Sequence, residues 1–202
     1  MSKEEIAERV GEVLGQVVAK VSFMLWQKED FRELIDFDKI SQTEQDRIFN
    51  ELEVSFLGLF ILYLENLSDD LKGQDDQKVV DVLKEKLPKG FVSVFRNLGV
   101  EEKFVKMWEQ LIKMRLDEYH EDYGLLLKEG KKIKGLKDDE AGLRFRWARV
   151  EAITLACLQH TRRGKLDEKD PLRKYLQGWI IGTDQIFVET IKDLVFKPVG
   201  RA

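Results

Sequence analysis

The sequence predicts an all-α protein, a single domain of six or seven helices packed like a bundle around a central apolar helix at about residues 42–67. Three observations predict this class. Apolar residues recur at the spacing of helical turns along most of the chain. Residues 54–64 carry no charge, although 36% of the chain is charged. Residues 91–95 alternate like a strand, but they have no second strand with which to pair.

The first helix is expected to begin at Ser2, because Ser2 and Glu5 have the spacing of a capping box. Its apolar stripe continues to Leu25. Gly11 and Gly15 lie four residues apart in this helix, where glycine normally weakens helical structure. We therefore expect these two glycines to let another backbone approach closely.

The central helix is expected to begin at Ser41, which forms a second capping box with Glu44. Its uncharged run is about 16 Å long at the helical rise per residue, roughly half the thickness of a bilayer core. A helix that is apolar on every side must be covered by other helices or by a partner. The run therefore predicts a buried helix and no membrane span.

The remaining helices follow from their start and stop residues. A helix at about 75–87 is expected to stop at Pro88, which lacks a backbone N–H. Residues 91–99 are expected to be helical and to end at Gly99. Longer helices are expected at about 100–128, 139–161 and 171–196, the last with Asp170 as its N-cap and Pro171 in its first turn. The Gly- and Lys-rich residues 129–138 predict a mobile connector.

Composition and charge limit the classes of protein. The single cysteine excludes an internal disulfide, and the N-terminus lacks a secretory signal, so we expect a cytoplasmic protein. Residues 1–127 hold 17 Lys and Arg against 27 Asp and Glu, whereas residues 128–202 hold 17 against 11. Such asymmetry is typical of a surface for nucleic acid or an acidic partner, or of head-to-tail self-contact, but a bundle also mixes both signs on one surface.

Two histidines limit the candidate metal sites. Asp117 and His120 are three residues apart and share one helix face, so they form a candidate metal-binding pair. The pair is half of a di-iron bundle pattern, but Cys157 precedes His160 where the other half would need a carboxylate. A solvated, charged helix end explains the same residues, and we expect no cofactor.

A candidate ligand site combines a lone acid with glycines. Asp184 shares a helical row with Ile180 and Phe187, so its carboxylate must be partnered or have a raised pKa. A narrow wet edge on a buried helix is the alternative explanation. Glycines four residues apart favour a close backbone contact or a pocket. The candidate residues, which would line an apolar cavity between the central and last helices, are Gly58, Tyr63, Gly178, Trp179, Gly182 and Asp184.

A basic stretch interleaves with Phe145 and Trp147, which is the mixture that phosphate contact and base stacking use. No helix-turn-helix, RNA-recognition or zinc-finger motif accompanies this stretch, so we expect no nucleic-acid partner. The candidate basic surface consists of Lys131, Lys132, Lys134, Lys137, Arg144, Arg146 and Arg149.

Two acidic clusters, residues 4–8 and residues 33–36, have the spacing Glu-Glu-x-x-Glu followed by Glu-x-x-Asp. This arrangement resembles that of the all-α nucleoside triphosphate pyrophosphohydrolases. The resemblance covers nine residues and implies that Glu4, Glu5, Glu8, Glu33 and Asp36 would hold Mg²⁺ or Mn²⁺ on a nucleotide's phosphates.

The strong patterns concern helix packing, so the leading functional hypothesis is a non-enzymatic protein that acts through self-association or by binding another protein. We expect a protein partner or a homo-oligomer such as a homodimer. A ligand-binding or sensor domain that takes a small apolar ligand is one alternative. The metal-dependent hydrolase of nucleotide type is the other.

Overall fold

The computed structural model describes residues 3–70, 74–130, 141–165, 167 and 169–192. Within these ranges the chain is all-α, as the sequence predicts, with seven α-helices, one 3₁₀ turn and no strand. The elements are α1 (Lys3–Trp26), α2 (Glu29–Leu34), η1 (Phe37–Lys39), α3 (Gln42–Asp70), α4 (Gln74–Asn97), α5 (Glu102–Gly130), α6 (Ala141–Thr161) and α7 (Pro171–Ile191).

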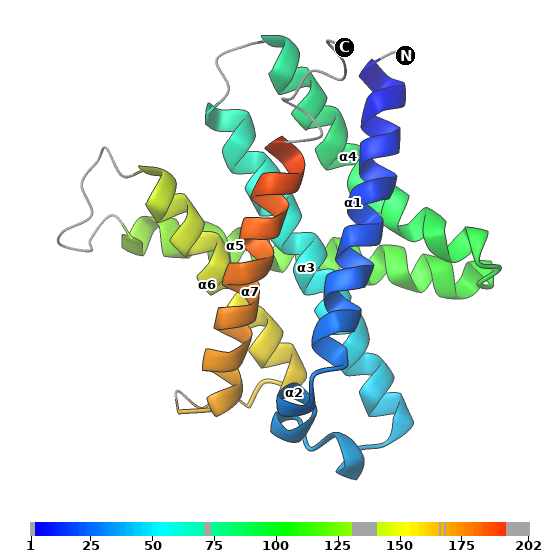
Figure 1. Ribbon diagram of the computed structural model, residues 1–202, viewed down its shortest axis with the longest axis vertical. Coiled ribbons are helices and arrows are strands. Elements are labelled where there is room, and N and C mark those ends of the chain that lie inside the picture. Colours follow the sequence, from blue (N-terminus) through cyan, green and yellow to red (C-terminus); the bar gives the residue numbers. More distant parts are fainter. Residues whose placement is uncertain (1–2, 71–73, 131–140, 166, 168, 193–202) are drawn as a thin grey trace.

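The buried part of α3 lies in the middle of the other helices (Figure 1). Every residue from 51 to 64 is buried, and α3 contacts α1, α4, α5, α6 and α7. In Figure 1, α1 and α7 run along the length of the molecule, whereas α4 and α5 meet in a projection to one side. Apolar burial of this extent is the main favourable term for folding, which explains why the uncharged run occupies the centre.

The first helix packs closely along α4, and its glycines permit the approach. A Cβ atom on Gly15 would lie 3.5 Å from Phe91 Cα, and one on Gly11 would lie 3.8 Å from the backbone of Lys86. From the other side, a Cβ on Gly90 would lie 3.5 Å from the backbone of Gly11. The expected close contact is therefore confirmed, and its partner is α4. The capping box expected at Ser2 lies outside the described residues.

Two predicted helix starts are confirmed by their caps. The Ser41 hydroxyl accepts a hydrogen bond from the Glu44 N–H at 3.3 Å, and the Asp170 carboxylate accepts one from the Leu172 N–H at 2.9 Å. Both caps satisfy N–H groups that have no partner inside the helix. The connector predicted at 129–138 lies outside the described residues from 131 on, as does the end predicted for the last helix at 196.

The predicted helix end at Pro88 is wrong, because α4 continues through Pro88 to Asn97. Proline removes one hydrogen bond inside a helix, but tertiary packing can outweigh that loss. Beyond Pro88, the rings of Phe91 and Phe95 pack on Trp108 of α5, with centroids 5.9 and 4.8 Å away. The helix then stops as predicted near Gly99, whose φ of 78° is left-handed and favours glycine.

In the described ranges, no helix is both long enough and apolar enough to cross a membrane. The uncharged run of α3 is covered by neighbouring helices instead. This finding agrees with the expected absence of a membrane span.

Candidate functional site

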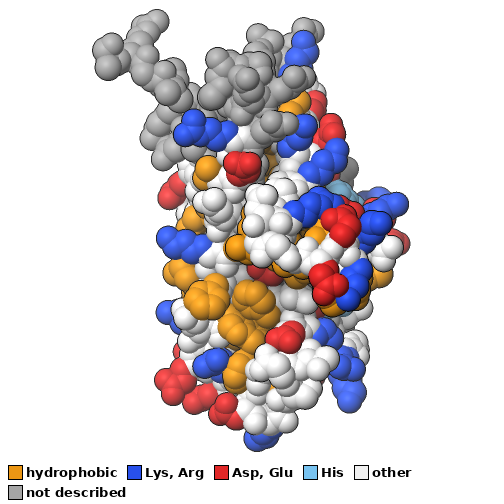
Figure 2. Space-filling view, turned by 90° about the vertical axis from the view of Figure 1, so that its right-hand side faces the viewer, with side chains coloured by type: hydrophobic (Ala, Val, Ile, Leu, Met, Phe, Trp, Pro, Cys, Tyr) orange, Lys and Arg blue, Asp and Glu red, His pale blue; other side chains and the backbone are white. Residues whose placement is uncertain are grey.

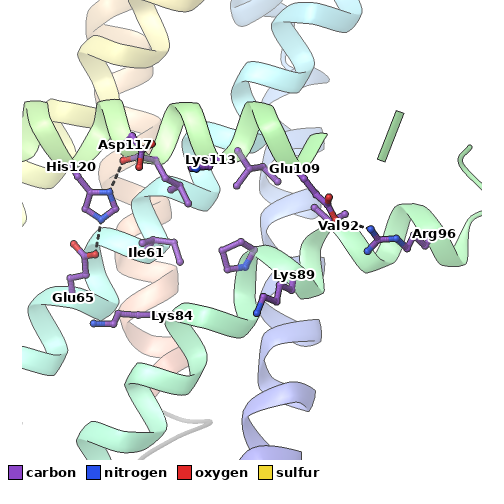
Figure 3. A pocket seen from close by; sticks show the side chains of 13 residues that line it. Ile61, Glu65, Lys84, Lys89, Val92, Arg96, Glu109, Lys113, Asp117 and His120 are labelled. Carbon is purple, nitrogen blue, oxygen red and sulfur yellow. Dashed lines mark hydrogen bonds and ion pairs between the residues drawn. The ribbon is translucent and has the colours of Figure 1, made fainter. Parts of the chain in front are cut away.

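A groove with a volume of about 550 Å³ lies where α4 and α5 diverge over α3 (Figure 3). Its floor is apolar, because Ile61, Val92 and Ile112 are each less than 5% exposed. Pro88 of α4 and Leu116 of α5 continue this floor. The volume lies within the range of protein binding sites, which combine apolar walls with a few polar groups.

His120 closes one end of the groove and is held by two acceptors. Its Nδ1 lies 2.5 Å from the carbonyl oxygen of Leu116, and its Nε2 lies 2.6 Å from the carboxylate of Glu65 (Figure 3). An imidazolium ring donates to both oxygens at once. The hydrogen bond to Glu65 raises the pKa of His120 above its ordinary value, although burial acts in the opposite direction.

This geometry does not favour the candidate metal pair, which stays a prediction. A metal ligand must offer a nitrogen lone pair, but both ring nitrogens of His120 are occupied by hydrogen bonds. Asp117 lines the groove and is exposed. Nowhere in the described part of the chain do three metal-binding side chains gather.

The acidic clusters that resemble those of pyrophosphohydrolases do not form a described site. The side chains of Glu4, Glu5 and Glu8 lie outside the described residues. Asp36 is bound to Lys39 at 2.6 Å, and Glu33 is exposed. The metal-dependent alternative therefore has no support from the described geometry.

The rim of the groove carries both signs of charge. Cations line it on α4 and α5, and carboxylates stand among them: Lys84, Lys89, Arg96, Lys113, Glu65, Glu109 and Asp117. Arg96 joins the two helices, because it donates to Glu109 at 2.7 Å and to Glu102 at 3.2 Å. Figure 2 likewise shows red and blue side chains together over the projection of α4 and α5, with orange hydrophobic side chains lower on the same face.

Asp184 is fully buried, and two arginines of α6 hold its carboxylate. Arg149 donates to it from Nε at 2.6 Å and from Nη2 at 3.0 Å, and Arg146 donates from Nε at 2.8 Å. Asp184 is therefore partnered, as a buried carboxylate must be. The structure thus joins residues that the sequence analysis had assigned to two separate sites.

Of the basic surface expected from the sequence, only Arg144, Arg146 and Arg149 have described side chains, and one of these three does not lie on the surface. Arg149 is only 4% exposed and turns inward. It donates from Nη1 to Asn66 at 3.4 Å, and its guanidinium lies 5.1 Å from the centre of the Tyr63 ring. Arg146 is bound to Asp184, and Lys131, Lys132, Lys134 and Lys137 lie outside the described residues. Arg144 packs beside Gly130.

The glycines expected to open a cavity between α3 and α7 do not face one another. A Cβ on Gly58 would lie 2.7 Å from Tyr119 Cε2, so this glycine makes room for a ring of α5. Gly178 and Gly182 are exposed, and a Cβ on either would meet nothing within 4 Å. Between α3 and α7, the rings of Phe60 and Phe187 stack. Trp179 lines a shallow surface pocket with Tyr175 instead.

A second polar network lies beside the core of α3, α5 and α6. Arg115 binds Glu51 at 2.7 and 2.9 Å and Glu118 at 3.1 Å, and Glu118 also contacts His160. Cys157 is 1% exposed in the same region, and burial raises the pKa of its thiol to about 12. This thiol is protonated at neutral pH, so it is not a ready nucleophile.

Sequence reasoning missed Glu65 and the lysines of the groove. Glu65 lies 55 residues from His120 and served only to mark the end of the apolar run. The available signal was that a carboxylate placed just beyond a buried helical segment needs a partner.

A scan against family models and searches of curated proteins and solved structures found no match to this chain.

Proposed function

We propose that this chain is a non-enzymatic binding protein whose groove between α4 and α5 holds an amphipathic helix of a partner protein. One observation carries the proposal: the groove has an apolar floor and a rim of both charges. The lining residues of α5 extend from Glu109 to His120. Eleven residue steps correspond to about 16 Å, which is three turns of a helix.

The charge pattern favours a peptide helix over a small apolar ligand. A helix that binds in a groove inserts apolar side chains spaced by three or four residues and leaves its polar face at the rim. Lys113 and Asp117 stand exposed on α5, one turn apart. These side chains offer partners of both signs to the flanks of such a helix, which sets its orientation and register.

The proposal is tested by selecting from a library of displayed peptides of about four helical turns. We expect enrichment of sequences with apolar residues spaced by three, four and seven, and we expect the synthetic peptides to bind with micromolar dissociation constants in fluorescence anisotropy. The variant Leu116→Glu places a charge on the half-buried floor and should weaken binding at least about tenfold. The control Met114→Glu, at a 52% exposed site on the same helix, should bind like the wild type.

Two results would overturn the proposal. One is that no amphipathic sequence is enriched against the wild-type protein. The other is that the selected peptides bind Leu116→Glu and wild type equally. Circular dichroism of both variants shows whether each keeps the helical fold.

We further propose self-association through an apolar face of α6 and α7. Leu143, Trp147 and Ile181 are between 36% and 57% exposed and line one shallow pocket. Arg146 and Glu151 line the same pocket, so a two-fold contact can place unlike charges opposite each other.

Sedimentation velocity at micromolar concentration should show a dimer that Leu143→Glu dissociates and Met107→Glu does not. A strictly monomeric protein would exclude self-association through this face.

A further inference from the structure

A second pocket, distinct from the groove, opens between α3, α6 and α7 beside the buried Asp184 cluster. Its volume is about 390 Å³, and its lining includes Tyr63, Asn66, Phe145, Arg146, Arg149 and Gln185. Arg149, Asn66 and Tyr63 are each more than nine-tenths buried. The pocket therefore has a fixed polar wall rather than loose surface side chains, which is the arrangement that defines a binding site.

Among the residues that the structure describes, the charges of this cluster do not balance. Arg146 and Arg149 bring two positive charges to the single carboxylate of Asp184. Lys192 adds a further cation to the lining. A surplus charge in a partly desolvated site is unfavourable unless an opposite charge approaches it. An anion is therefore the ligand that these residues accept.

Donor groups of the arginines remain available in the pocket. Asp184 binds Arg146 only through Nε, and among the described residues the Nη1 and Nη2 atoms have no hydrogen-bond partner. Arg149 Nη1 donates only one long hydrogen bond, to Asn66 at 3.4 Å, which is weaker than a bond of ordinary length. The Asn66 amide itself donates to the Tyr123 hydroxyl. Asp184 thus fixes two guanidinium groups side by side while leaving N–H groups for a carboxylate or phosphate.

The rest of the wall is apolar and aromatic. The Tyr63 ring lies beneath the Arg149 guanidinium, with 5.1 Å between the Arg149 Cζ atom and the ring centre. Phe145, Leu67 and Val188 also line the pocket. A bare inorganic ion would leave this surface uncovered, so the chemistry favours an anion that carries an apolar body.

We propose that the pocket beside Asp184 binds a small organic anion, whose carboxylate or phosphate pairs with Arg146 and Arg149 while its body covers Tyr63 and Phe145. Asp184 is then a positioning residue that holds both guanidinium groups in place. This site is independent of the groove between α4 and α5, whose lining shares no residue with it.

The test is isothermal titration of the full chain with phenyl phosphate, benzoate, inorganic phosphate and the neutral benzyl alcohol. We expect phenyl phosphate or benzoate to bind more tightly than benzyl alcohol and inorganic phosphate, and the tighter of the two identifies the head group. Arg146→Gln should weaken the binding at least about tenfold. The control Lys174→Gln removes the same charge from an exposed site on α7 outside this pocket. It should change the affinity for the aromatic anion less than about twofold.

A second variant keeps the test decisive if Arg146→Gln does not fold. Gln185 is exposed at the pocket, so Gln185→Glu leaves the core intact and places a negative charge where the anion enters. This change should also lower the affinity for the aromatic anion. Absence of binding at about 5 mM probe, equal binding of benzyl alcohol, or full binding by both pocket variants would each overturn the proposal.

Discussion

Glu53 is a carboxyl group inside α3 that is only 6% exposed. Burial raises the pKa of its carboxyl from 4.5 to about 8. Because this folded-state pKa lies above that of the unfolded chain, the folded state prefers the neutral acid. The stability that the neutral acid contributes is complete below pH 4.5 and is lost as the pH rises toward 8.

Glu53→Gln should therefore stabilise the protein in a pH-dependent way. The amide stays neutral, so we expect the free energy of unfolding to exceed that of the wild type by roughly 2 kcal/mol or more at alkaline pH, and by little near pH 4.5, since each pKa unit corresponds to about 1.4 kcal/mol. Urea denaturation at both pH values measures this difference. Glu29→Gln, at an exposed position, should show no such dependence, and a gain for Glu53→Gln that is equal at both pH values would contradict the assignment.

At the scale of helices, sequence patterns predicted most starts, because capping groups act locally: Ser41 and Asp170 mark the first turns of α3 and α7. Pro88 was misread because the packing of Phe91 and Phe95 on Trp108 comes from another helix. The prediction that Gly58 lines a cavity is wrong because its contact also comes from another helix. Its actual neighbour, Tyr119, lies 61 residues away, and no local pattern indicates that contact.

Gly58→Ala should destabilise the contact between α3 and α5. A methyl group there would overlap the buried Tyr119 ring and approach Ile153 to 3.2 Å. Overpacking of this kind costs about 1–3 kcal/mol, which exceeds the gain of about 1 kcal/mol from helix propensity. In Gly124→Ala of α5, the added methyl group would have no atom within 4 Å, so only the gain in helix propensity remains. Thermal unfolding should therefore show a lower midpoint for the first variant and a slightly higher one for the second. A midpoint for Gly58→Ala at or above that of the wild type would exclude the overlap.

At the scale of the whole molecule, the sequence predicted the fold class and the buried centre but not how the sites assemble. Asp184 was recognised as a carboxylate that needs a partner, and Arg149 as a cation. Their pairing joins α6 to α7 over 35 residues and depends on how those two helices face each other. The groove likewise requires the crossing of α4 and α5 over α3, which apolar periodicity alone does not determine.

The buried position of Cys157 gives the molecule an internal reporter of opening. Its thiol lies where α3 and α6 meet, next to Ser55, and is 1% exposed. A thiol reagent can react only after these helices separate, so we expect Ellman's reagent to label the native protein orders of magnitude more slowly than the unfolded chain. The labelling rate should rise with urea in step with global unfolding, and Gly58→Ala should accelerate it. Rapid labelling without denaturant would show that α6 opens locally.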